Sequence, residues 1–223
     1  MGAGNSAEFI RMIAVGAIPV IFAITLHEVA HGRMARHFGD RTAEMLGRLS
    51  INPIRHVDPL GTVLVPLLTL WMGGLLFGWA KPVPINPRAM RNPRYAMVAV
   101  AAAGPAANLL MAFGWVLVLR LASSMLATLP GVGEFLLRMA EIGILINLLL
   151  LIFNLLPILP LDGGRVLRGL VPEAIGRRLD VLEPYGLIIV LGLLFLGTFN
   201  KVLGPLLMSL SKLFFLLGGV KGG

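Results

Sequence analysis

The chain has 223 residues, of which 57% are hydrophobic and only 13% are charged, and its mean hydropathy is +0.87. Soluble domains usually carry about 25% charged residues, so this composition argues against a soluble protein and for a polytopic membrane protein. The net charge of +8 comes from basic residues scattered beside apolar stretches. This pattern favours the Lys and Arg bias of cytoplasmic loops over nucleic-acid binding.

Five apolar stretches are long enough to enter or cross a membrane. They cover about 9–35, 60–80, 95–122, 139–161 and 185–217. The last is too long for one span, and Asn200 and Lys201 divide it into two predicted helices, about 185–199 and 203–217. Each of these is shorter than the roughly 20 residues that a span needs. The sequence therefore predicts one domain over 1–223, an all-α polytopic membrane protein with about five to six transmembrane helices.

Basic residues cluster after three of these stretches, and such clusters mark the cytoplasmic side of a membrane. They are Arg33, Arg36, Arg41, Arg48 and Arg55; Lys81, Arg88, Arg91 and Arg94; and Arg165, Arg168, Arg177 and Arg178. A full crossing by 60–80 would place one of its two flanking clusters on the wrong side. That stretch also holds the central pair Gly73-Gly74. We therefore interpret about 50–94 as an insertion whose apolar part is re-entrant or dips into the membrane.

The first stretch contains the motif His27-Glu28-Val29-Ala30-His31. Residues four apart share one face of a helix, so both imidazoles can reach a single metal ion. Glu28 then lies beside the attacking water as a general base. Ionisable side chains inside a membrane helix are costly and usually functional. The alternative is that these residues lie past the helix end at the interface, which Arg33 and Arg36 show to be near.

A catalytic zinc site needs a third protein ligand, and a chain without cysteine must supply it from His or a carboxylate. Asp162 is the strongest candidate, because Asp40, Asp58 and Asp180 all lie in basic segments. It is expected to close the apolar helix of 139–161, after Pro157 and Pro160, which break the helix, and before Gly163-Gly164, which free the backbone. The alternative is an ordinary Asp-Gly-Gly turn. Asp162 and the histidines can share a metal only if their two helices run the same way, as a re-entrant 60–80 allows.

Two amides inside apolar stretches have two possible roles. Asn108 ends the run Gly104-Pro105-Ala106-Ala107-Asn108, and Asn154 begins the run that leads to Asp162. Each amide could pack helices together or bind an unwound substrate strand. An extended substrate could also pair with a small cytoplasmic-side β element near 46–51 or 83–86. The remaining histidines, His37 and His56, are interpreted as surface or supporting residues.

These motifs together resemble the site-2 protease family of intramembrane zinc metalloproteases. The resemblance rests on HExxH in the first apolar stretch, GPxxN, and the later Asn-x-x-Pro-x-x-Pro-Leu-Asp-Gly-Gly, and it covers nearly the whole chain. Segments 47–53, 56–62 and 78–84 are similar to a prokaryotic branch of the family, and no segment resembles a PDZ or CBS domain. The insertion at 50–94 makes the interval between His31 and Asp162 longer than in compact members.

The resemblance implies that one zinc ion is bound by His27, His31 and Asp162, and that Glu28 is catalytic. It further implies that Asn108 and Asn154 contact substrate. The expected reaction is hydrolysis of peptide bonds within or near transmembrane helices of single-span membrane proteins, as in regulated intramembrane proteolysis. The expected location is the cell membrane, with the active site towards the cytoplasm.

Two other classes of protein remain open. A transporter or channel could use the same histidines and carboxylates as a translocation site. A catalytically silent scaffold could bind membrane helices, although a scaffold has no use for Glu28. One zinc per chain together with peptide cleavage would separate an enzyme from both. The oligomeric state and the identity of the substrate are left open by the sequence.

Overall fold

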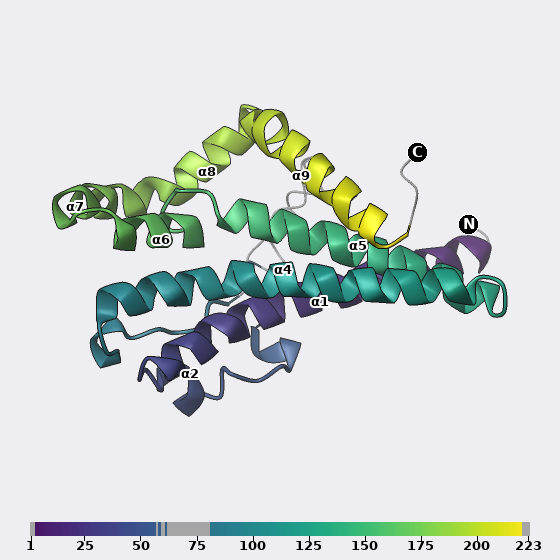
Figure 1. Cartoon of the computed structure of the whole chain (residues 1–223), viewed down its shortest axis with the longest axis horizontal. Helices are drawn as coiled ribbons and strands as arrows, with labels where there is room; N and C mark the ends of the chain where they lie inside the picture. The colour runs from purple at the N-terminus through teal and green to yellow at the C-terminus, as the bar shows by residue number, and fades with distance from the viewer. Residues whose placement is uncertain (1–2, 57, 59–60, 62–80, 220–223) are drawn as a thin grey trace.

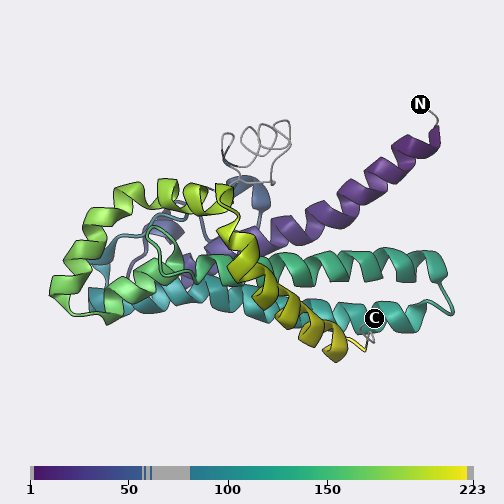
Figure 2. The ribbon, with the colours of Figure 1, turned by 90° about the horizontal axis from the view of Figure 1, so that it is seen from above.

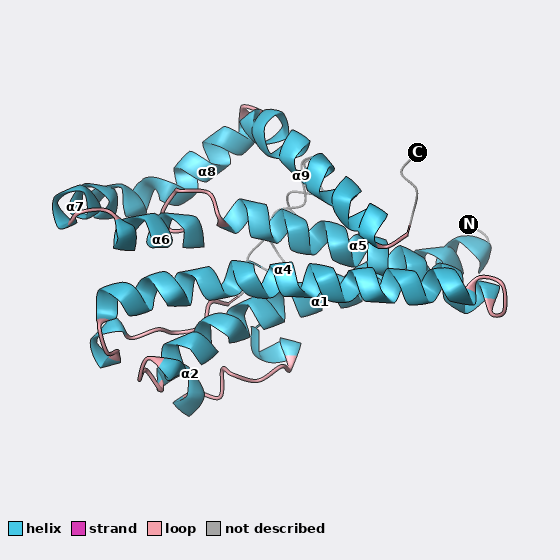
Figure 3. Cartoon of the chain, in the orientation of Figure 1, coloured by secondary structure: helices cyan, strands magenta, loops and turns pink. Residues whose placement is uncertain are grey.

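The computed structural model describes residues 3–56, 58, 61 and 81–219. Every regular element within these residues is a helix (Figure 3), which confirms the all-α prediction. The β element predicted at 46–51 or 83–86 is wrong at both segments, because 46–49 are turns and 83–86 are irregular. Gly47 has a φ of 64°, which turns the chain. Pro84 removes one of the backbone donors that a strand would need.

Within the described residues, three helices are long and apolar enough to cross a membrane. Helix α1 (Ala3–His37) meets this criterion over Val15–His37, and the other two are α4 (Pro93–Met125) and α5 (Pro130–Asn154). Helices α4 and α5 pack along each other and α1 crosses them (Figure 1), while the N-terminal half of α1 diverges from both (Figure 2). The predicted re-entrant stretch 60–80 lies, apart from Gly61, outside the described residues.

Small side chains bring α4 and α5 close together. Their shared core contains residues at helical spacing from both helices and one phenylalanine from α9 (Thr198–Leu217): Ala112, Val116, Leu119, Ala140, Ile144, Leu148 and Phe214. A Cβ atom at Gly143 would lie 2.5 Å from Cε2 of Trp115. Only glycine therefore allows this approach of the two helices, as is common in membrane proteins.

The chain after α5 forms four α-helices within the described residues, and the sequence predicts only the last two of them. Helices α6 (Asp162–Leu170) and α7 (Glu173–Leu182) were not predicted. The predicted pair in 185–217 exists as α8 (Gly186–Phe195) and α9. The predicted division at Asn200 and Lys201 is wrong, because both lie within α9. The break falls at Gly197, whose φ of 67° is a left-handed conformation that glycine adopts without steric cost.

Asp162 opens a helix instead of closing one, contrary to the sequence-based expectation. Helix α5 ends at Asn154, because Pro157 and Pro160 have no N–H with which to continue it. Helix α6 then begins at Asp162. A Cβ at Gly164 would lie 2.7 Å from the carbonyl oxygen of Ile158, so glycine is needed where α6 packs against the preceding loop.

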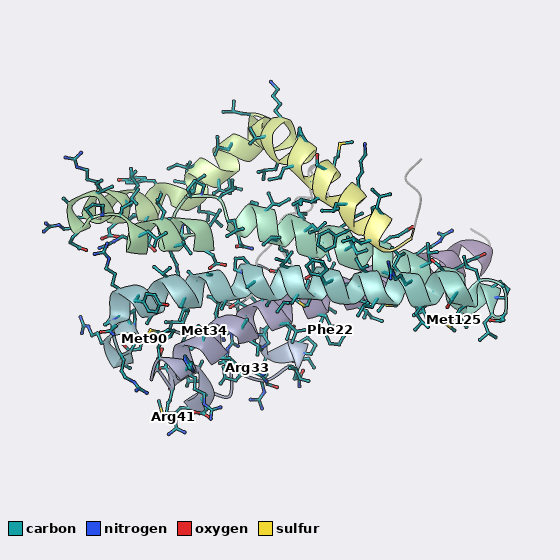
Figure 4. The ribbon with its side chains drawn as sticks, viewed as in Figure 1. Phe22, Arg33, Met34, Arg41, Met90 and Met125 are labelled. Carbon is teal, nitrogen blue, oxygen red and sulfur yellow. The ribbon has the colours of Figure 1, made fainter. Side chains whose placement is uncertain are left out.

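The directions of α1 and α5 agree with the prediction that Asp162 and the two histidines lie at the same end of the bundle. Helices α1 and α5 run the same way, and their C-terminal ends lie at the end of the bundle that carries α6 (Figure 1). Arg33 and Arg41 lie towards this end and Met125 at the opposite end (Figure 4). The remaining short elements are α2 (Thr42–Met45), η1 (Pro53–His56) and η3 (Pro87–Ala89), while η4 (Glu183–Tyr185) lies between α7 and α8 in the chain.

Candidate metal centre

The structure brings His27, His31 and Asp162 together. The Nε2 atoms of the two imidazoles lie 3.0 Å apart, with the ring planes almost perpendicular. Oδ2 of Asp162 lies 3.2 Å from Nε2 of His27 and 3.3 Å from Nε2 of His31. All three residues are buried. Three potential ligand atoms, two from α1 and one from the first residue of α6, thus converge on one point.

In each histidine, the hydrogen bond made by Nδ1 determines which of the two ring nitrogens carries the proton. Nδ1 of His31 lies 2.7 Å from the carbonyl oxygen of Val100, and a carbonyl can only accept a hydrogen bond. Nδ1 of His27 lies 2.6 Å from Oδ1 of Asn108, whose Nδ2 donates to Oδ1 of Asn147 at 3.0 Å. Both rings therefore donate through Nδ1. Their Nε2 lone pairs face Asp162, as in a metal-binding histidine.

These atoms fit a divalent metal. Oδ2 of Asp162 is buried and has no hydrogen-bond partner in the described part of the chain. A buried carboxylate without a partner costs several kcal/mol. A proton on one ring would satisfy a single neighbour, whereas a cation between the three atoms contacts all of them. Their separations are close to the distance of about 3.3 Å between ligands of a tetrahedral ion with bonds of about 2.0 Å. Two histidines and one aspartate also match the three protein ligands of a catalytic zinc site.

Gly104 of α4 provides the space for both imidazoles. A Cβ atom there would lie 2.5 Å from Cε1 of His31 and 2.6 Å from Cε1 of His27. The rings cannot move aside without losing the hydrogen bonds of their Nδ1 atoms to Val100 and Asn108. By sequence, this GPxxN run indicates a polar amide and close helix packing. Nothing in the run shows that the glycine itself faces the histidines.

Asn108 and Asn154, the two predicted substrate-contacting amides, occupy different environments. Asn108 is fully buried, and its hydrogen bonds go to His27, to Asn147 and to the carbonyl oxygen of Ala23. Its contacts are those of a residue that positions His27. Asn154 is half-buried and lines a cavity of about 170 Å³ together with His27 and Asp162. Asn147 was not predicted, although a polar amide in so apolar a helix is a usable signal.

Glu28 lines the same cavity as His27 and His31, but it is not one of the three converging groups. Its Oε2 accepts a hydrogen bond of 2.8 Å from the backbone N–H of Val83. A carboxylate beside a metal site, but outside its ligand set, is placed to exchange protons with a reacting water. In this structure the residues that could hold a metal ion are thus distinct from the glutamate of the HExxH motif.

Helix α6, which carries Asp162, is fixed at its other end by two arginines. Arg94 of α4 donates through Nε to the carbonyl oxygen of Gly169 at 2.8 Å. Arg168 donates to both oxygens of Asp180 at 2.8 and 2.9 Å and to both oxygens of Glu173. The hydrogen bonds from this guanidinium hold the pKa of Asp180 below its usual value. The sequence pattern indicates only cytoplasmic charges at Arg94 and Arg168 and does not predict these bonds.

The other two histidines lie away from the metal centre. His37 is exposed and contacts the ring of Phe38 edge to face. His56 is only 2% exposed, and its Nε2 donates to the carbonyl oxygen of Ser50 at 2.8 Å. The first is a surface residue and the second supports the fold of the insertion, in line with the sequence-based interpretation.

Comparisons with known proteins identify the family of this chain. The family model for peptidase family M50 matches residues 126–197, which include Asn154 and Asp162. YwhC of Bacillus subtilis, named as a candidate zinc metalloprotease, is 41% identical over 202 residues, or 88% of this chain and 89% of that protein. Rip2 of Mycolicibacterium smegmatis, named in the same way, is 32% identical over 202 residues, or 88% of this chain and 74% of that protein. No solved structure gives a significant match. The chain belongs to peptidase family M50, the site-2 protease family.

Proposed function

We propose that this chain is a zinc metalloendopeptidase that cleaves single-span membrane proteins within or next to the bilayer. The observation that carries the proposal is the convergence of His27, His31 and Asp162 within 3.3 Å, beside Glu28 and among helices able to span a membrane. The relatives named as candidate zinc metalloproteases support zinc as the metal.

The proposed mechanism assigns a separate role to each residue. His27, His31 and Asp162 hold the zinc ion, which when bound acts as a Lewis acid towards water and towards the scissile carbonyl. Glu28 takes a proton from the attacking water and returns it to the leaving amine. Asn154, on the cavity wall, contacts the substrate backbone. Asn108 is assigned a new role: because it is fully buried, it positions His27 and does not touch substrate.

The proposed location is the cell membrane, with the active site towards the cytoplasm. The metal centre lies at the end of the bundle where the arginine-rich segments follow α1 and α5, and such segments stay on the cytoplasmic side. Helices α8 and α9 and the stretch 60–80 supply the further membrane segments of a five- to six-span protein, with 60–80 re-entrant. A helical substrate has its carbonyls engaged in hydrogen bonds, so a segment of it unwinds before cleavage.

Removal of the metal tests this function. The reporter is a single-span membrane protein, tagged at both ends, whose apolar helix is weakened by a central Gly-Pro pair. Wild-type protein in proteoliposomes is expected to cleave it, to lose activity with 1,10-phenanthroline and to regain it when zinc is added back. Zinc flux without cleavage would support a transporter instead, and reporter binding without cleavage would support a scaffold.

A further inference from the structure

Residues 81–86, here called the strap, belong to the insertion at 50–94 and border the cavity of the metal centre. Pro82, Val83 and Ile85 line the same cavity as Glu28 and the metal-binding histidines. The N–H of Val83 donates to Oε2 of Glu28 at 2.8 Å. Because proline has no N–H, Val83 is the sole backbone donor within 82–84. That one donor is directed to the proposed general base.

The beginning of the strap is tied to the first part of the insertion. The N–H of Lys81 donates to the carbonyl oxygen of His56 at 2.9 Å. Nη2 of Arg48 donates to the carbonyl oxygens of Lys81, at 2.9 Å, and of Pro82, at 3.3 Å. The guanidinium of Arg48 also donates to the carbonyl oxygen of Arg55. These bonds join the start of the strap to residues 48–56, next to the point where Pro82 lines the cavity.

The end of the strap is tied to a buried carboxylate after α1. Oδ2 of Asp40 accepts the N–H of Asn86 at 2.6 Å, and Oδ1 accepts the N–H of Thr42 at 2.9 Å. Asp40 is 1% exposed. Burial by itself would raise the pKa of Asp40, but the hydrogen bonds from Thr42 and Asn86 outweigh it and hold the pKa below its usual value. The anchor therefore stays charged at neutral pH.

Between its two anchors the strap packs on the helix that carries the motif. The side chain of Val83 is 5% exposed. A Cβ atom at Gly32, one residue after His31, would lie 3.0 Å from Cγ1 of Val83. The glycine thus lets the strap lie close against α1, one helical turn beyond Glu28. The hydrogen bonds at the two ends of the strap, together with this contact, fix the position of the Val83 amide relative to α1.

From this geometry we infer that the strap orients the general base, with Val83 as a positioning residue that acts through its backbone amide. The inference rests on the proposed catalytic role of Glu28. A glutamate side chain samples many rotamers, and a hydrogen bond to one carboxylate oxygen selects among them. The other oxygen then faces the reacting water. The insertion at 50–94, to which the sequence assigns no role, thereby contributes a residue that positions the general base.

Two substitutions at Val83 separate its amide from its side chain. Val83→Pro removes the N–H, whereas Val83→Ala keeps it and removes most of the packing. Cleavage of the tagged single-span reporter gives kcat and KM, and zinc content together with the visible spectrum of the cobalt-substituted protein reports on the metal centre. We expect the kcat of Val83→Pro to lie at least about tenfold below that of Val83→Ala, with similar KM, zinc content and cobalt spectrum. Equal kcat values in the two variants would overturn the inference.

Asp40→Ala provides a second test if Val83→Pro fails to fold or loses zinc. This substitution releases the Asn86 end of the strap but leaves Val83 and the metal-binding residues unchanged. The inference requires a lower kcat at an unchanged zinc content, and an unchanged kcat would overturn it. Wild-type protein without zinc-dependent cleavage would instead overturn the proposed function. Wild-type cleavage with no difference between the two Val83 variants would overturn the strap's role alone.

Discussion

Glu28→Gln is expected to keep its zinc and to lose cleavage of the membrane reporter by about 10²–10⁴-fold, the range for removal of a general base. Glutamine has nearly the same shape as glutamate, and its amide oxygen can still accept the hydrogen bond from Val83. It cannot take a proton from water. Zinc is retained because Glu28 is outside the group formed by His27, His31 and Asp162.

The control for this substitution is Glu44→Gln. Glu44 lies at the same end of the molecule but outside the cavity, where it pairs with Arg36 at 3.1 Å and with Arg41 at 2.9 Å. Exposed pairs of this kind contribute at most about 1 kcal/mol to stability, so this variant is expected to cleave the reporter like wild type. Full activity of Glu28→Gln, or loss of its zinc, would contradict the assigned role.

Gly104→Ala is expected to weaken zinc binding by about 10–100-fold, the usual effect of disturbing groups that orient metal ligands. The new methyl group would overlap Cε1 of both His27 and His31. To escape it, the rings must give up their Nδ1 hydrogen bonds to Asn108 and Val100, which hold Nε2 towards the metal. The measurement is competition for zinc against a chelator of known affinity.

Gly114→Ala is the matched control on the same helix. A Cβ atom at Gly114 would have no neighbour within 4 Å. Alanine favours a helix over glycine by about 1 kcal/mol, so this variant is expected to bind zinc like wild type and to be at least as stable. If both glycine variants bind zinc equally well, Gly104 does not provide the space for the imidazoles.

The grouping of His27, His31 and Asp162 could be predicted because local rules determine most of it. The spacing of His27 and His31 places both rings on one face of a helix whatever surrounds it. The prolines before Asp162 and the charges of the loops then indicate where the carboxylate lies and at which end of the bundle. The prediction of the helix boundary was less successful, since Asp162 begins α6 and does not end α5.

The groups around the ligands could not be predicted, because they depend on how the helices rotate against each other. Gly104 and Asn108 belong to one motif, yet only the packing of α4 on α1 shows that the first makes room for the rings and the second holds one of them. An amide in a membrane helix suits helix packing and substrate binding equally well by sequence alone. The bond from Val83 to Glu28 joins residues 55 positions apart, and no local pattern encodes it.

The zinc content of the detergent-purified protein, measured for wild type, His27→Ala and Asp162→Ala, decides whether the three-ligand site exists and requires no substrate. The proposed site predicts about one zinc per chain in wild type and a clear loss in both variants, because each substitution removes one of three protein ligands. Wild-type protein without zinc, or Asp162→Ala protein with as much zinc as wild type, would contradict the three-ligand site on which the proposed function depends.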